Sequence, residues 1–319
     1  MATPAIAQGG DGFAAVALSF KPVRASQDSS YHLLVTGYFN NNPTRPFNFL
    51  YDTGASYSVI TDTTARSLHL LVQSATANGN TSVTGTTRLI RFADIPILTI
   101  QTDHLFQPIT FSGRFTVFSD QQFASAGMPI SGSIGSDLWA GFGQVFDFKE
   151  CRITLFKPSQ VDSARLLELG FAVATPVPLS VNAFGVPSLT LHLRQGNQEA
   201  EQTVVLDTGS TTTIISHQTA TSLGLKPTGS AIMVSSAFGD YRITPAVVDT
   251  LRIGGIVQHN VTVYYPERDT AETGGFTLGT DILQHYKMLL SMSDKKVYLL
   301  PAQTAPVVTV APAPAPPAK

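Results

Sequence analysis

The chain is poor in cysteine, in charge and in long apolar runs. Its 319 residues include one cysteine, Cys151, which excludes an intramolecular disulfide and a cysteine-rich zinc site. Charged residues make up 13% of the chain and the formal net charge is −2, so no basic surface for nucleic acid is indicated. No apolar run approaches the roughly 20 residues of a membrane span. We therefore expect no metal or other cofactor, no nucleic-acid partner and no transmembrane segment.

The signatures of other hydrolase classes are missing as well. The sequence contains no H-E-x-x-H zinc helix and no G-x-S-x-G nucleophile elbow. The seven histidines are scattered, and we interpret them as surface or packed residues. Cys151 lies at an expected hairpin turn and is interpreted as an inert thiol. Trp139 stands where an apolar helix residue is expected, so we assign it to the core.

The two ends of the chain differ in composition from the rest. Residues 1–12 have no basic region and no long apolar core, but Ala5-Ile6-Ala7 resembles the small-x-small end of a signal peptide. Residues 303–319 are rich in Pro and Ala, which predicts an extended, disordered tail. This composition favours an exported protein (periplasmic, envelope-bound or secreted) over a cytoplasmic one and leaves the compartment open.

An acidic triplet at the end of an apolar run occurs twice. Asp52-Thr53-Gly54 follows "NFLY", and Asp207-Thr208-Gly209 follows "TVVL" 155 residues later. From each Asp onward, 9 of 19 positions are identical without a gap. Downstream, Ile134-Gly135 is matched by Leu278-Gly279 in the second half. The chain therefore contains an internal duplication.

Two carboxylates in equivalent positions of related halves can be brought face to face. Like charges a few ångströms apart do not both ionise easily, so such a pair shares one proton. Of Asp52 and Asp207, one can then act as general base on a water while the other, protonated, polarises a carbonyl. This chemistry suits hydrolysis of an amide bond without a covalent intermediate or a metal.

The residues around each Asp fit this chemistry. Gly54 and Gly209 allow a tight turn that a Cβ would obstruct. The hydroxyls of Thr53 and Thr208 can each tie their loop to the opposite lobe.

The downstream glycines, Gly135 and Gly279, are expected to pack beneath the two loops. Asp137 and Asp281 follow them by two residues, and we interpret both as helix caps rather than catalytic groups.

These motifs resemble those of the pepsin/retropepsin aspartic peptidases. "YDTGAS" and "LDTGST" match the catalytic loop, "SIGSD" and "TLGTD" match the later apolar-Gly element, and the resemblance covers roughly residues 13–302. It implies an all-β, bilobal pepsin-like acid-protease fold: two pseudo-symmetric β-barrel lobes with a few short helices. Asp52 and Asp207 become the catalytic dyad, and a peptide or protein substrate binds extended in a cleft between the lobes. Because both lobes are in one chain, we expect a monomer.

The order of the repeats predicts the domain boundaries. After an extension over residues 1–12, the N-terminal lobe spans 13–160 and the C-terminal lobe 176–302, followed by the tail at 303–319. The junction at 161–175 contains the best helix candidate, "VDSARLLELG", with Gly170 as its stop.

The sequence departs from the pepsin pattern directly after each triplet. The next residue is Ala55 in the first copy and Ser210 in the second. A hydroxyl at this position can hydrogen-bond the carboxylate and favour its ionisation, so losing it at Ala55 predicts a less acidic dyad and a pH optimum milder than pepsin's. With its similar halves, the chain is most similar to bacterial retropepsin-like proteins with two fused copies.

The resemblance also implies a flap, a glycine-bearing hairpin over the cleft. Residues 78–88, with Gly85, fit in the first half, and residues 235–244, with Gly239 and Tyr241, fit in the second. The first hairpin has no counterpart of the pepsin flap tyrosine. Tyr241 is either a related residue or an ordinary hairpin residue, and the number of functional flaps stays open.

Two functions remain in view. The first is an aspartic endopeptidase that uses Asp52 and Asp207 with support from Thr53, Gly54, Thr208, Gly209 and Ser210. The alternative is a catalytically silent retropepsin-like protein that binds peptides or serves a structural role. The presence of both aspartates favours the enzyme, because a silent relative has no chemical need for two.

Overall fold

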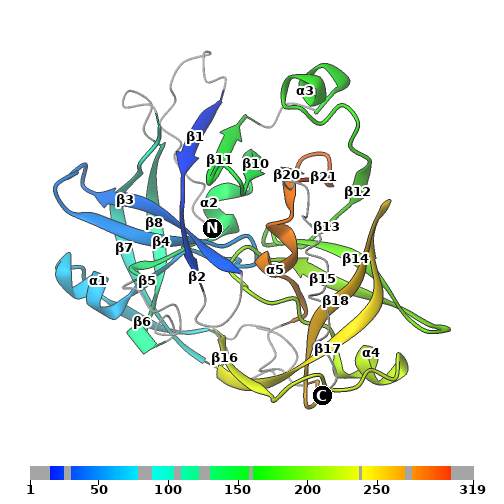
Figure 1. Cartoon of the computed structure of the whole chain (residues 1–319). Coiled ribbons are helices and arrows are strands. Elements are labelled where there is room, and N and C mark those ends of the chain that lie inside the picture. The colour runs from blue at the N-terminus through cyan, green and yellow to red at the C-terminus, as the bar shows by residue number, and fades with distance from the viewer. Residues whose placement is uncertain are drawn as a thin grey trace, which may run out of the picture.

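The computed structural model describes residues 15–24, 30–77, 88–103, 109–121, 130–157, 161–236, 239–269 and 275–302. These residues form two β-lobes that share one further sheet (Figure 1). The predicted all-β, bilobal class is thereby confirmed.

The N-terminal lobe is a closed barrel within an eight-stranded sheet. The strand order is β2-β3-β4-β9-β5-β8-β7-β6, and an additional pairing of β3 with β7 closes a ring of six strands. The strands are β2 (Lys21–Arg24), β3 (Tyr31–Phe39), β4 (Pro46–Tyr51), β5 (Val59–Thr61), β6 (Gln73–Ala77), β7 (Arg88–Ile100), β8 (Ile109–Phe118) and β9 (Gly132–Ile134).

The C-terminal lobe repeats this arrangement with a seven-stranded sheet. Its order is β16-β17-β14-β15-β19, with β13 on β14 and β18 on β17. Isolated bridges from Ile214 to Tyr264 and Thr277 close this lobe where β5 closes the first. The strands are β13 (Ser180–Val181), β14 (Pro187–Gln195), β15 (Gln198–Leu206), β16 (Ile232–Ser236), β17 (Gly239–Ile253), β18 (Ile256–Pro266) and β19 (Thr277–Leu278).

A six-stranded sheet joins the two lobes. Its order is β1-β11-β10-β20-β21-β12, and the pairing of β10 with β20 crosses from one half of the chain to the other. The strands are β1 (Val16–Ser19), β10 (Gly143–Asp147), β11 (Arg152–Phe156), β12 (Pro176–Pro178), β20 (Tyr286–Ser291) and β21 (Lys296–Pro301). Backbone hydrogen bonds therefore hold the lobes together on the side where the final hairpin of each half lies (Figure 1).

Five short helices lie among the described residues: α1 (Asp62–Ser67), α2 (Ser136–Trp139), α3 (Ser163–Glu168), α4 (His217–Ser222) and α5 (Thr280–Leu283). The helix predicted between the halves is confirmed as α3. Asp162 caps its start by accepting from the backbone N–H of Arg165, and Gly170, with φ of 81°, follows its end. Thr61 and Ser216 cap α1 and α4 in the same way, at equivalent positions of the two copies.

The core contains the residues that the sequence assigned to it. Trp139 is 1% exposed and stacks on Tyr51 with ring centroids 4.7 Å apart. Tyr51 ends β4, so this stack supports the strand that leads to Asp52. Cys151 lies in the turn between β10 and β11 with φ of 48°, and burial raises the pKa of its thiol, as expected for an unreactive cysteine.

Candidate active site

The first acidic triplet begins where β4 ends. The backbone N–H of Asp52 donates to the carbonyl of Ile134 on β9 at 3.1 Å. The chain then turns sharply, and Oδ1 of Asp52 accepts from the backbone N–H groups of Gly54 (3.0 Å) and Ala55 (2.9 Å). The backbone thus fixes the orientation of this carboxyl group.

The second triplet repeats this geometry after β15. The N–H of Asp207 donates to Leu278 at 3.0 Å, and its Oδ1 accepts from Gly209 (2.8 Å) and Ser210 (3.1 Å). One expectation was wrong: the hydroxyl of Ser210 does not reach the carboxylate. It donates to the carbonyl of Thr212 at 2.8 Å, because the loop turns back there, so both carboxyl groups accept the same pair of backbone donors.

Two buried threonines tie the loops to each other across the lobes. The N–H of Thr53 donates to Oγ1 of Thr208 (3.1 Å), and the N–H of Thr208 donates to Oγ1 of Thr53 (3.0 Å). Each hydroxyl in turn donates to a carbonyl of the opposite strand at 2.7 Å, Thr53 to Leu206 and Thr208 to Tyr51. All four groups are satisfied, so the two Asp residues are held at a fixed mutual position.

The glycines of the triplets allow the carboxyl groups to approach each other. A Cβ at Gly54 would lie 2.5 Å from Cγ of Asp207, and one at Gly209 would lie 2.5 Å from Cγ of Asp52. Any side chain at either position would therefore displace the carboxyl of the other lobe. Both carboxyl residues remain partly exposed, whereas Thr53 and Thr208 below them are buried.

The environment disfavours two negative charges here. Burial raises the pKa of both Asp52 and Asp207, and the charge of Asp207 raises the pKa of Asp52 further. The backbone N–H groups of each loop oppose this shift in part. A hydrogen bond between the two carboxyl groups also contributes, so this arrangement favours a pair that shares one proton.

Gly135 and Gly279 lie beneath the loops, where they were expected. A Cβ on Gly135 would meet the carbonyl oxygen of Tyr57 at 2.8 Å, and one on Gly279 would meet that of Thr212 at 2.5 Å. Each glycine N–H donates to a buried hydroxyl, that of Ser58 (3.0 Å) or Thr213 (3.1 Å).

The interpretation of Asp137 and Asp281 as helix caps was wrong. The N-caps of α2 and α5 are Gly135 and Gly279, and neither helix has a side-chain cap. Each aspartate lies in the first turn and accepts from a hydroxyl at 2.7 Å, Asp137 from Ser58 and Asp281 from Thr213.

The supports Ser58 and Thr213 were missed in the sequence. Both carry a hydroxyl, and they stand 155 residues apart, the offset of the two triplets. This recurrence is the signal that could have found them.

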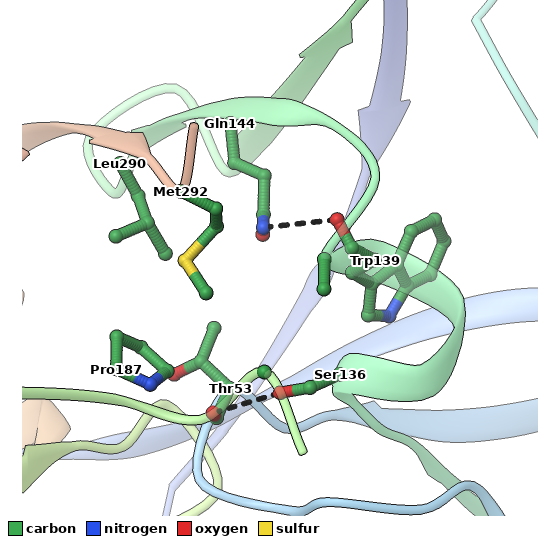
Figure 2. Close-up of a pocket in the computed structure, with 9 residues that line it drawn as sticks. Thr53, Ser136, Trp139, Gln144, Pro187, Leu290 and Met292 are labelled. Carbon is green, nitrogen blue, oxygen red and sulfur yellow. Dashed lines mark hydrogen bonds between the residues drawn. The ribbon is translucent and has the colours of Figure 1, made fainter. Parts of the chain in front are cut away.

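Figure 2 shows how the two lobes meet behind the first loop. Thr53, Ser136 and Gln144 of the first half face Pro187, Leu290 and Met292 of the second around a cavity of about 10 Å³. The Ser136 hydroxyl donates to the carbonyl of Thr53 at 3.4 Å. This space is a packed joint, since it holds at most about one water molecule.

The flap candidates differ in what the structure describes. Gly85 lies outside the described residues. Gly239 pairs with Ser236 at the closed end of the β16–β17 hairpin. Tyr241 is half-buried, and burial together with the charge of Asp207 raises the pKa of its phenol to about 12. The phenol is therefore close enough to the dyad to sense its charge.

The rest of the described chain adds no competing site. Within it, no three His, Cys, Asp or Glu side chains are grouped so that they could hold a metal ion. No helix of the described ranges has the length and apolar character needed to cross a membrane.

Comparisons with known proteins agree with this geometry at the level of the family. A family model described as aspartyl protease matches residues 35–137 and 193–282, one segment around each triplet. No curated protein matches the chain.

Several solved structures are similar in overall shape. Conglutin gamma, a basic 7S globulin from lupine seeds, is 13% identical, with 90% of this chain and 94% of that chain covered and a TM-score of 0.49. Basic 7S globulin from soybean is 12% identical, with 90% and 95% covered and a TM-score of 0.45. A retropepsin-like aspartic protease from Rickettsia conorii is 16% identical, with 40% and 90% covered and a TM-score of 0.30. At these scores, the three structures carry no argument about function.

Proposed function

Because the chain belongs to the aspartyl protease family, we propose that it is an aspartic endopeptidase acting on extended polypeptide substrates. The observation that supports this most directly is the pair Asp52 and Asp207, each packed against the glycine of the opposite loop. A binding protein needs neither two facing carboxyl groups nor the raised pKa values that their burial causes.

The proposed mechanism uses one proton shared by the two carboxyl groups. A water held between Asp52 and Asp207 loses a proton to the ionised carboxylate and attacks the carbonyl carbon of the substrate. The protonated carboxyl polarises the carbonyl oxygen, and the tetrahedral intermediate collapses when the leaving nitrogen takes up a proton. The backbone donors on each Oδ1 keep both carboxyl groups oriented throughout.

Tyr241 is proposed to lie beside the substrate on the C-terminal side of the dyad. Its half-buried phenol senses the charge of Asp207 from the β16–β17 hairpin. In this position the ring excludes water from the reacting groups, and its hydroxyl can hydrogen-bond a peptide group.

A peptide-library cleavage assay between about pH 3 and 8 tests the function. We expect cleavage within peptides, inhibition by pepstatin, and loss of turnover in both Asp52→Asn and Asp207→Asn. The asparagines keep the shape of the loops but cannot share a proton.

The alternative, a catalytically silent peptide-binding or structural protein, gives a different result in the same assay. Such a protein shows no cleavage, and Asp52→Asn retains whatever peptide the wild type binds. We also propose a monomer, because each lobe supplies one Asp of the pair, and an exported bacterial protein on the basis of its terminal composition.

A further inference from the structure

Two buried polar atoms at the entry to β3 have no hydrogen-bond partner within the described residues. They are Oγ of Ser30, which is fully buried, and Nδ1 of His32. Residues two apart in an extended chain point to the same side, so both atoms face the same region. Unpaired buried polar atoms are rare in native proteins and call for an explanation.

This strand entry lies directly against the second catalytic loop. The hydroxyl of Thr280, which begins α5, donates to the carbonyl of Tyr31 at 2.9 Å and so anchors the strand to the other lobe. The next residue, His32, has its ring against the backbone of Gly209, with which it interacts as a hydrogen-bond donor. The N–H of Gly209 holds Oδ1 of Asp207 at 2.8 Å. A single residue therefore separates the imidazole from the carboxyl group.

The equivalent position in the other lobe carries no such group. Leu34 of β3 pairs with Leu50, and Ser188 of β14 pairs with Val205. Leu50 and Val205 each precede their Asp by two residues, so Leu34 corresponds to Ser188 and, two residues earlier, His32 corresponds to Val186. Val186 is 4% exposed and apolar. Simple burial of the strand entry therefore needs only an aliphatic side chain, and the imidazole is an addition on one side of the dyad.

The protonation state of the ring follows from its surroundings. Burial lowers the pKa of His32 below its ordinary value, so the ring is neutral at neutral pH and carries one N–H. Contact with the Gly209 backbone as a donor, with Nδ1 unpaired, assigns that hydrogen to Nε2. Nδ1 is then an acceptor, and the unpaired hydroxyl of Ser30 is a donor of matching sense.

We infer that His32 is a positioning residue for Asp207. Its Nε2–H holds the carbonyl of Gly209, and thereby the loop whose N–H groups orient the carboxyl. Ser30 steadies the ring from the opposite nitrogen. This inference rests on the proposed peptidase function, and it makes the dyad asymmetric: the first loop has backbone support alone, whereas the second is braced from the other lobe.

The test compares His32→Val, which copies Val186, with His32→Gln, which keeps an N–H donor without the ring. His192→Val is the matched control, since His192 lies on β14 and pairs with Glu201 on the lobe surface. We expect His32→Val to lower kcat by roughly tenfold or more with KM changed by less than about threefold, because a displaced carboxyl affects chemistry more than binding. His32→Gln is expected to recover most of the loss, Ser30→Ala to show a smaller loss, and His192→Val to match the wild type.

Amide hydrogen exchange in the same variants gives a readout that needs no activity. In His32→Val we expect faster exchange at residues 208–210, with residues 53–55 unchanged as the internal reference. Unchanged exchange and kcat in His32→Val would overturn the inference, and so would equal losses in His32→Val and His32→Gln that follow thermal stability. If the wild type cleaves nothing while exchange at 208–210 responds as expected, the peptidase proposal fails and the bracing of the loop stands.

Discussion

Gly54 lies against the carboxyl group of Asp207, so a residue of one lobe limits the space of the acidic group in the other. A Cβ at Gly54 would come within 2.7 Å of both carboxylate oxygens of Asp207. The converse contact, Gly209 against Asp52, has the same distances. The two lobes therefore determine the geometry of the pair jointly.

Alanine at either glycine is expected to abolish activity. In Gly54→Ala the new methyl group must displace Asp207, and near-attack geometry is lost, so kcat should fall by on the order of 100-fold or more. Steady-state kinetics checks this, with Gly141→Ala as control because nothing lies within 4 Å of a Cβ there. Normal turnover in Gly54→Ala would contradict the close packing of the dyad.

The paired threonines are expected to contribute measurably to stability. Thr53→Val keeps the shape of the side chain but leaves the N–H of Thr208 and the carbonyl of Leu206 without a partner. Each such loss costs about 1–3 kcal/mol of the free energy of unfolding. Denaturant unfolding of Thr53→Val, Thr208→Val and the double variant measures it, and Thr53→Ser is the control that keeps the hydroxyl. Equal stability of the Val and Ser variants would contradict the network.

Removing one carboxyl group is expected to stabilise the protein at neutral pH. The folded-state pKa values of Asp52 and Asp207 are raised, so the folded protein binds their protons more tightly than the unfolded chain does. This contribution is fully present below the unfolded pKa, about 3.9, and is lost as pH rises through the folded values.

Asp52→Asn lacks that loss. Its melting temperature should exceed that of the wild type by roughly 2 °C or more at pH 7, with a smaller difference near pH 4. Thermal scans across this range check the sign. A difference that does not grow with pH would show that the pair is not strained by its charge.

Tyr241→Phe is expected to weaken catalysis modestly. If the phenol hydrogen-bonds the substrate, its loss costs about 0.5–1.5 kcal/mol, or roughly 3- to 10-fold in kcat/KM. Tyr38→Phe is the control, since that hydroxyl bonds Gln101 on the N-terminal lobe. Equal kinetics for the two variants would show that Tyr241 is an ordinary hairpin residue.

The duplication made the site predictable where backbone and side chain repeat together. The triplets, their threonines and the downstream glycines recur at fixed offsets, and their contacts follow from that pattern. The role of Ser210 was not predictable, because a loop hydroxyl has several acceptors in reach and only the turn toward Thr212 selects one. His32 was missed for a related reason. It has no counterpart in the second copy, and its contact with Gly209 arises only when the lobes meet.

The central claim is that two carboxyl groups share one proton and act on one water. The pH dependence of kcat/KM on a cleaved peptide tests it most directly. The account predicts a bell-shaped profile with an optimum clearly above the pepsin range of about pH 2, and no turnover above background at any pH in Asp52→Asn or Asp207→Asn. A profile that peaks near pH 2 would contradict the raised pKa values, and turnover retained in either variant would contradict the shared proton itself.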